Sequence, residues 1–128
     1  MSLPVELLRK HDVPFQWGVS DCVQWAGAAV EFFSGRDPVS HYRYSTEEEA
    51  RAIIAASGSL EALVTREIGE PRARCSEAAL GDVVLSVFRE TGPILGVADP
   101  PVFWLRAPAG YIPVEMTLAL RVWPCRKP

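Results

Sequence analysis

Residues 15–25 read FQWGVSDCVQW, and they mark a loop that turns into a helix with a cysteine on its first turn. Asp21 suits the N-cap position, because its carboxylate can accept from the free backbone N–H groups at a helix start. Gln24, three residues further on, can reach back to the N-cap amide and complete a capping box. Cys22 then meets the positive end of the helix dipole, which favours the nucleophilic thiolate. The sequence therefore puts Cys22 where a catalytic cysteine would be placed.

The helix that starts at Asp21 is expected to run to about Phe33 and to end at Gly35, a residue that suits a helix C-cap. Helical periodicity gathers apolar and small residues on one face, namely Cys22, Ala26, Ala29 or Val30, and Phe33. The small side chains of residues 26–29 (AGAA) let a helix sit close to a sheet. We therefore expect a central buried helix.

Three further helices are predicted around it. Residues Leu3–Lys10 have the apolar spacing of a short amphipathic helix. Thr46 caps a second helix, Glu49 completes its capping box, and the acids at 47–49 favour its dipole rather than forming a metal site. Ser59 caps a third helix. The helical half of the chain is thus expected to cover about residues 1–70.

The second half of the chain consists of short apolar runs separated by turn residues. Residues Asp82–Phe88 form a continuous apolar run that predicts a buried strand. Four later strands are expected at Pro93–Ala98, Val102–Arg106, Tyr111–Val114 and Leu118–Trp123. This spacing indicates an antiparallel meander, in which Pro113 marks an edge position or a bulge. Helices followed by strands over about residues 80–124 predict one α+β domain spanning residues 1–128.

Composition and charge narrow the classes of protein. Hydrophobic residues make up 48% of the chain and charged residues 23%, which is ordinary for a soluble globular domain. The net charge of −3 gives no reason to expect nucleic acid or an anionic membrane as a partner. No apolar run approaches the length that spans a bilayer, and residues 1–6 lack the pattern of a signal peptide. We therefore expect a protein that is made in a cytoplasm and stays there or leaves as part of a larger particle.

Cysteine spacing gives no framework for covalent or metal cross-links. Cys22, Cys75 and Cys125 are far apart and odd in number, which fits neither a disulfide scaffold nor a zinc site. Unbridged thiols are the default prediction, with a Cys75–Cys125 bridge as the alternative. The acids and histidines show no ligand spacing either, so no metal or other cofactor is expected.

The quoted stretch also carries a resemblance. An aromatic-x-Trp-Gly sequence followed by Asp-Cys at the start of an alanine-rich helix resembles the nucleophile segment of the NlpC-type papain-like peptidases, which cleave peptide bonds in bacterial peptidoglycan. Residues 81–85 (GDVVL) resemble the Gly-Asp-hydrophobic strand of that family. A closer resemblance is to a short phage-encoded relative found among tail genes, which is matched further by residues 35–38 (GRDP) and Tyr44. The match covers roughly residues 14 to 98, in the right order.

The resemblance implies a fold and a set of site residues. The fold would be papain-like, with the N-terminal helices and the Cys22 helix packed on a small curled antiparallel sheet. Cys22 would be the nucleophile. Trp17, Gly18, Asp21 and Asp82 would support it from the surrounding loops.

The base that the family needs has no counterpart in this chain. In the family it is a histidine at the start of the strand that follows Gly-Asp, and alignment of the glycines puts Glu90 at that position. A carboxylate with an ordinary pKa of about 4.3 is a poor base for a thiol with a pKa of about 8.5, and its charge would repel a thiolate. The two histidines, His11 and His41, precede this region and are expected to be surface or loop residues.

Each candidate also has a purely structural interpretation. Cys22 can be a small buried residue, since unbridged cysteine is among the most buried types. Asp21 can be only a cap, and Asp82 can hydrogen-bond backbone at a strand entrance. The aromatic candidates are expected to fill the core rather than bind a ligand; they are Trp17, Trp25, Phe103, Trp104 and Tyr111.

Three hypotheses about function follow. The favoured one is a structural component of the tail tip of a tailed phage or phage-like particle such as a gene transfer agent, with a peptidase-like fold that has lost catalysis. Such a protein would be assembled in the bacterial cytoplasm into the virion tail. It would contact tail-tip or hub proteins through its C-terminal strands and residues 123–128.

The second hypothesis is an active cell-wall cysteine endopeptidase or amidase that uses Cys22 on peptidoglycan, with a base that is unidentified or comes from a partner chain. The third is a cytosolic hydrolase of small molecules or peptides unrelated to phage, which rests on fold analogy alone. Whether the protein is an enzyme is left open by the sequence.

Overall fold

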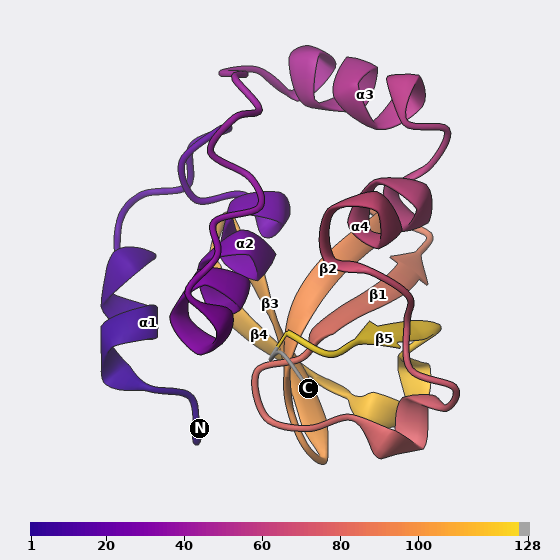
Figure 1. Cartoon of the computed structure of the whole chain (residues 1–128). Coiled ribbons are helices and arrows are strands. Elements are labelled where there is room, and N and C mark those ends of the chain that lie inside the picture. The colour runs from indigo at the N-terminus through magenta and orange to yellow at the C-terminus, as the bar shows by residue number, and fades with distance from the viewer. Residues whose placement is uncertain (126–128) are drawn as a thin grey trace.

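A computed structural model describes residues 1–125, and in that part of the chain four α-helices precede a five-stranded antiparallel sheet (Figure 1). The fold is therefore α+β, as predicted. The helices are α1 (Val5–Lys10), α2 (Cys22–Ser34), α3 (Glu47–Ala56) and α4 (Leu60–Ile68). The strands are β1 (Val83–Phe88), β2 (Gly92–Asp99), β3 (Val102–Ala107), β4 (Gly110–Glu115) and β5 (Arg121–Trp123), and two short 3₁₀ helices are η1 (Cys75–Glu77) and η2 (Met116–Leu118).

The predicted caps position the helices. Asp21 accepts from the backbone N–H groups of Val23 and Gln24 at 3.0 and 3.1 Å, and Gly35 ends α2 in the left-handed conformation with φ 78°. Thr46 and Ser59 accept from backbone amides in the first turns of α3 and α4. These are local contacts between residues two or three positions apart, which is why the sequence specifies them.

The two predicted capping boxes have different outcomes. Gln24 does not reach back to the amide of Asp21; its side-chain amide donates to the Tyr44 hydroxyl at 3.3 Å. The carboxylate of Glu49 does interact with the cap residue Thr46, whose hydroxyl lies 3.3 Å from it. It also accepts from the backbone amide of Ser45, one residue before the cap, at 2.9 Å.

The sheet has the strand order β4-β3-β2-β1-β5. Strands β1 to β4 form the predicted meander, with Val84 paired to Gly96 and Phe103 paired to Val114. The last strand departs from the prediction, because Met116–Leu118 forms η2 and the strand is only Arg121–Trp123. It returns to pair with β1 instead of extending the meander beyond β4. Pro113 lies on β4, an edge strand as expected, and a proline has no N–H to offer to a further strand.

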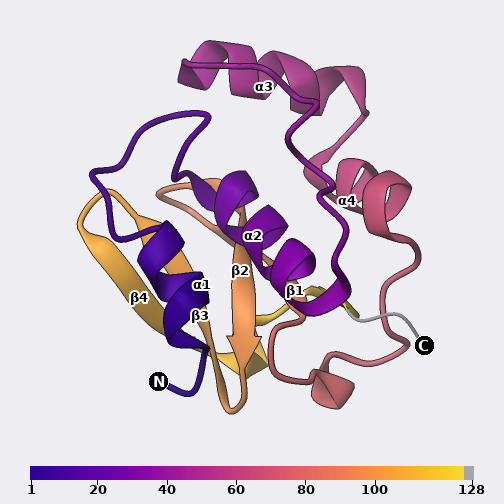
Figure 2. The same ribbon diagram turned by 60° about the vertical axis from the view of Figure 1, so that its left-hand side comes forward.

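One face of the sheet carries α1, α2 and α4, while α3 lies away from the sheet next to α4 (Figures 1 and 2). Under α2 and α4, Ala26 and Val30 pack with Leu95 and Trp123. Under α1, Leu7 packs against Trp25 and Val97. The predicted inward face of α2 is confirmed. Gly27 makes room for Val39 of the following loop, since a Cβ there would lie 2.4 Å from that side chain, so only part of the small-residue segment faces the sheet.

The other face of the sheet has its own core cluster. Val84, Phe103 and Leu105 form its centre, and residues next to η1 and η2 pack against it. Trp25 and Phe103 are fully buried, and Trp104 and Tyr111 are half-buried among core residues. The prediction that these aromatic side chains fill the core is confirmed.

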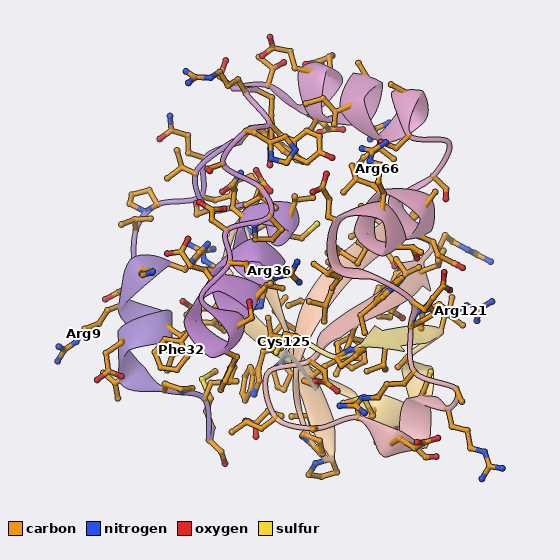
Figure 3. The ribbon with its side chains drawn as sticks, in the orientation of Figure 1. Arg9, Phe32, Arg36, Arg66, Arg121 and Cys125 are labelled. Atoms are coloured by element: carbon orange, nitrogen blue, oxygen red, sulfur yellow. The ribbon has the colours of Figure 1, made fainter. Side chains whose placement is uncertain are left out.

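The C-terminal residues were expected to reach a partner. Trp123 and Cys125 are instead buried in the core under α2 and α4, and Figure 3 shows Cys125 near the middle of the molecule. Residues 126–128 lie outside the described residues. The default prediction of unbridged thiols is confirmed: the alternative bridge between Cys75 and Cys125 is not formed, and the two side chains pack in clusters on opposite faces of the sheet.

Within residues 1–125, no helix combines the length and the apolar character needed to cross a bilayer.

Candidate functional site

The carboxylate of Asp21 is the centre of a hydrogen-bond network at the start of α2. It is 1% exposed, and besides capping α2 it accepts from the Gly18 amide at 2.7 Å. The Tyr44 hydroxyl lies 2.9 Å from both of its oxygens. One side chain thus holds the helix start, the Trp-Gly loop before it and the loop that carries Tyr44.

Gly18 and Tyr44 meet directly in this network. Gly18 has φ 83°, and a Cβ there would lie 2.1 Å from the Tyr44 carbonyl oxygen. Burial raises the pKa of the Tyr44 hydroxyl, and the charge of Asp21 adds to that effect. Tyr44 therefore stays protonated and donates to the carboxylate.

The Cys22 thiol does not behave as the sequence predicts. Burial raises its pKa to about 11, and the neighbouring charge of Asp21 acts in the same direction. Main-chain hydrogen bonding at Leu95 on β2 opposes this shift without cancelling it. The expected stabilisation of a thiolate by the helix dipole is outweighed by desolvation and by the capping anion. Cys22 is half-buried against the core cluster that contains Leu95, and near neutral pH its thiol is protonated.

Glu90 is the residue that the resemblance to NlpC-type peptidases aligns with their histidine. It lies in the exposed turn between β1 and β2. Leu95, whose main chain meets the thiol, is five residues further on. The strand residues between them, Gly92 to Leu95, span on the order of 10 Å, and Glu90 lies beyond Gly92 in the turn. The geometry therefore separates Glu90 from Cys22.

The two histidines have different surroundings. His41 is exposed in a loop as expected, where its Nε2 lies 3.3 Å from a Glu67 carboxylate oxygen. His11 lies in the turn after α1, so the expectation of a surface or loop residue holds for its place in the chain. Its side chain is nevertheless buried, at 4% exposed, and its ring centroid lies 5.3 Å from that of Trp25. In the described part of the chain no hydrogen bond joins either imidazole to the Cys22 thiol.

The Gly-Asp pair before β1 makes contacts that hold the start of this strand in place. Asp82 is 1% exposed, and it accepts from the Ala79 amide at 2.9 Å and from the Arg72 guanidinium at 2.7 Å. Gly81 has φ 90°, and a Cβ there would lie 2.2 Å from the Phe33 ring. The predicted backbone hydrogen bond of Asp82 is confirmed, and the ion pair with Arg72 is an additional partner.

Residues 35–38 (GRDP) form the turn that follows α2. Gly35 ends α2, and the Asp37 carboxylate accepts from the amides of Val39 and Ser40, both at 3.1 Å. That turn seats Val39 on Gly27 of α2. The residues of the quoted motifs thus have defined contacts within the fold.

The remaining space near α2 is small. An apolar cavity of about 20 Å³ lies between α2, α4 and the loop at Val39, and Cys22 is not among its lining residues. Such a volume holds about one water molecule.

Trp17 is half-buried beside Phe15, with ring centroids 5.4 Å apart, and so belongs to a surface aromatic pair rather than to a core cluster. Among residues 1–125, no three His, Cys, Asp or Glu side chains are grouped as metal ligands.

Residues 2–125 match the model of the family described as "Domain of unknown function (DUF6950)". The chain belongs to the DUF6950 family. No curated protein matches it. Because the description of the DUF6950 family names no activity, the resemblance to NlpC-type peptidases stays a prediction.

Two features of this DUF6950 domain were missed by sequence reasoning. Arg106 is buried on β3, and its guanidinium donates to the carbonyls of His11 and Val13. On the surface beside α4, Tyr42 and Arg66 join His41, Glu67 and Ser57 in a polar cluster, with Arg66 visible on α4 in Figure 3. Nothing in the local sequence around either group indicates these partners, which come from distant parts of the chain.

Proposed function

We propose that this protein is a structural component of the tail tip of a tailed phage or phage-like particle, such as a gene transfer agent, and that its fold is a papain-like fold of the NlpC type that has lost catalysis. The support for the fold is the cysteine helix packed on an antiparallel sheet, with the resembling motifs in the right order. The support for the tail is the resemblance of those motifs to the short tail-encoded relative. Its partners would be other tail-tip or hub proteins, and its location the virion tail.

The observation that carries the loss of catalysis is the environment of Cys22. A cysteine peptidase needs a thiolate and a base that takes and returns a proton. Here the thiol pKa is raised to about 11, its strand neighbour is Leu95, and Glu90 is in an exposed turn. The motif residues Gly18, Asp21 and Tyr44 contact one another, which supports a structural role for them.

Particle composition tests the structural role. Particles induced from the host that encodes the chain would be purified on a density gradient and analysed by mass spectrometry. The proposal expects the chain in fixed stoichiometry with tail proteins, and expects a chain carrying Cys22→Ala to assemble equally well. A chain that stays in the soluble fraction while intact tails sediment would reject the tail assignment.

An active peptidase is the second candidate, and the position of Cys22 as the first residue of α2 favours it. A partner chain would then have to supply the base. Peptidoglycan digestion by wild-type particles and by particles with Cys22→Ser separates the two candidates. Equal digestion supports the structural role, whereas loss of digestion in the serine variant alone supports the enzyme.

A further inference from the structure

His11 is a buried imidazole whose two ring nitrogens have no hydrogen-bond partner in the described structure. It sits at the C-cap of α1, with its ring edge against Trp25 of α2. A neutral imidazole carries one donor and one acceptor, and neither is satisfied here. The site therefore offers no hydrogen bond that would offset the cost of burying a charged ring.

The charges that face His11 come from three elements. Lys10 on α1 and Arg106 on β3 oppose a positive imidazole, and Asp21 at the start of α2 favours one. The Arg106 guanidinium donates to the His11 carbonyl at 3.2 Å, so this cation is fixed beside the ring. Tyr111 on β4 is a further titratable group in this region, and its ring packs against Trp25, which His11 also contacts. Burial is the largest cause that lowers the pKa of His11, which falls to about 4.

The same place is where the N-terminal segment, defined here as residues 1–16, is attached to the rest of the fold. Arg106 donates to the Val13 carbonyl, and the Tyr111 hydroxyl donates to the Leu8 carbonyl at 2.9 Å. Leu7 is fully buried in the cluster with Trp25. Figure 2 shows α1 lying against the outside of α2 and the sheet, at one end of the molecule.

We propose that His11 makes the docking of the N-terminal segment acid-sensitive: protonation of its ring places a second cation beside Arg106 in an apolar site, and the segment then detaches from α2 and the sheet while the rest of the fold stays intact. Detachment uncovers Trp25 and Tyr111. This inference does not depend on the proposed tail function.

The direction and size of the pH effect follow from the difference in proton binding between two forms of the protein. In the closed form the N-terminal segment is docked and the neutral ring is preferred. In the open form the segment is detached, and the exposed histidine binds a proton with an ordinary pKa near 6.5. Opening therefore becomes more favourable as the pH falls through about 6.5, and it levels off below about 4. Between pH 7 and pH 5 the opening equilibrium is expected to rise about 20-fold.

Hydrogen exchange measured by mass spectrometry tests this at pH 7 and pH 5, after correction for intrinsic exchange rates. Peptides from residues 3–16 should lose protection about 20-fold at pH 5, while peptides from residues 83–99 keep theirs. The chain has only two histidines, so His41→Gln is a matched control that should keep the effect, and His11→Phe should remove it. Equal protection of residues 3–16 at both pH values, or an unchanged effect in His11→Phe, would overturn the proposal.

A titration that leaves His11 in place guards against a misfolded variant. In the His41→Gln chain the single imidazole can be followed by proton NMR from pH 7.5 to 3.5. The proposal expects His11 to titrate below pH 6.5 together with the loss of protection of α1. Titration of His11 at an ordinary value while α1 stays protected would contradict it.

Discussion

At the scale of single residues, Asp21 joins three segments of the chain through one carboxylate. Its carboxylate caps α2, holds the Gly18 amide and receives the Tyr44 hydroxyl. The contacts of Asp21 within the fold therefore account for this residue of the resembling motif without any catalytic role. Its removal would leave several buried donors without partners, which costs more than the loss of an exposed cap.

Substitution of Asp21 by Ala should lower the free energy of unfolding by about 2–3 kcal/mol, and Tyr44→Phe should lower it by about 1 kcal/mol. The two losses should not add, because they share one hydrogen bond. Urea denaturation of both variants and of the double variant measures this. Fully additive losses would mean that the Tyr44 hydroxyl does not depend on Asp21.

Gly18 should tolerate a side chain much less well than Gly58. Both have positive φ, but a Cβ at Gly18 meets the Tyr44 carbonyl, whereas a Cβ at Gly58 has nothing within 4 Å. Gly58→Ala should cost about 1–2 kcal/mol from backbone conformation alone, and Gly18→Ala about 2–4 kcal/mol because overpacking adds to it. Thermal or urea unfolding decides between them, and equal losses would show that the Trp-Gly loop moves away from Tyr44 without cost.

At the scale of elements, the helix starts and stops follow the sequence closely, and the long-range contacts do not. Asp21, Thr46 and Ser59 cap their helices because the partners are two or three residues away. The strand after η2 pairs with β1, and no local pattern near Arg121–Trp123 indicates that choice. The same difference holds in the candidate site. The helix cap by Asp21 could be predicted from neighbouring residues, whereas the hydrogen bond from the Tyr44 hydroxyl to Asp21 joins residues 23 positions apart and could not.

Arg106 attaches α1 and the loop after it to β3, so this contact should control local opening of that element. Arg106→Met leaves the His11 and Val13 carbonyls without their donor. The free energy needed to detach residues 1–16 from the rest of the fold should therefore fall by about 2 kcal/mol. Thermolysin digestion should then cut near Val13 and Phe15 at native temperature. Arg9→Met is the control on the same segment, because Arg9 points away from the molecule in Figure 3. Equal cutting of the two variants would show that Arg106 does not fix the segment.

At the scale of the whole molecule, the chain is an α+β fold in which the proposed position of a nucleophile holds a thiol whose pKa is raised. The helical half and the sheet meet at Cys22, where α2 begins over β2. The family resemblance could be recognised from sequence, but the state of the thiol could not. That state depends on burial of the thiol next to Leu95 and on the negative charge of Asp21, and both are products of the assembled fold.

The pH dependence of Cys22 alkylation tests the central claim most directly. Folded protein would be treated with iodoacetamide between pH 6 and pH 10.5, and the peptide that contains Cys22 would be quantified by mass spectrometry. Since only the thiolate reacts and the pKa of Cys22 is raised to about 11, the rate should keep rising to the highest pH without a plateau. Fast alkylation that is already at a plateau near neutral pH would reveal an activated thiolate and would contradict the loss of catalysis.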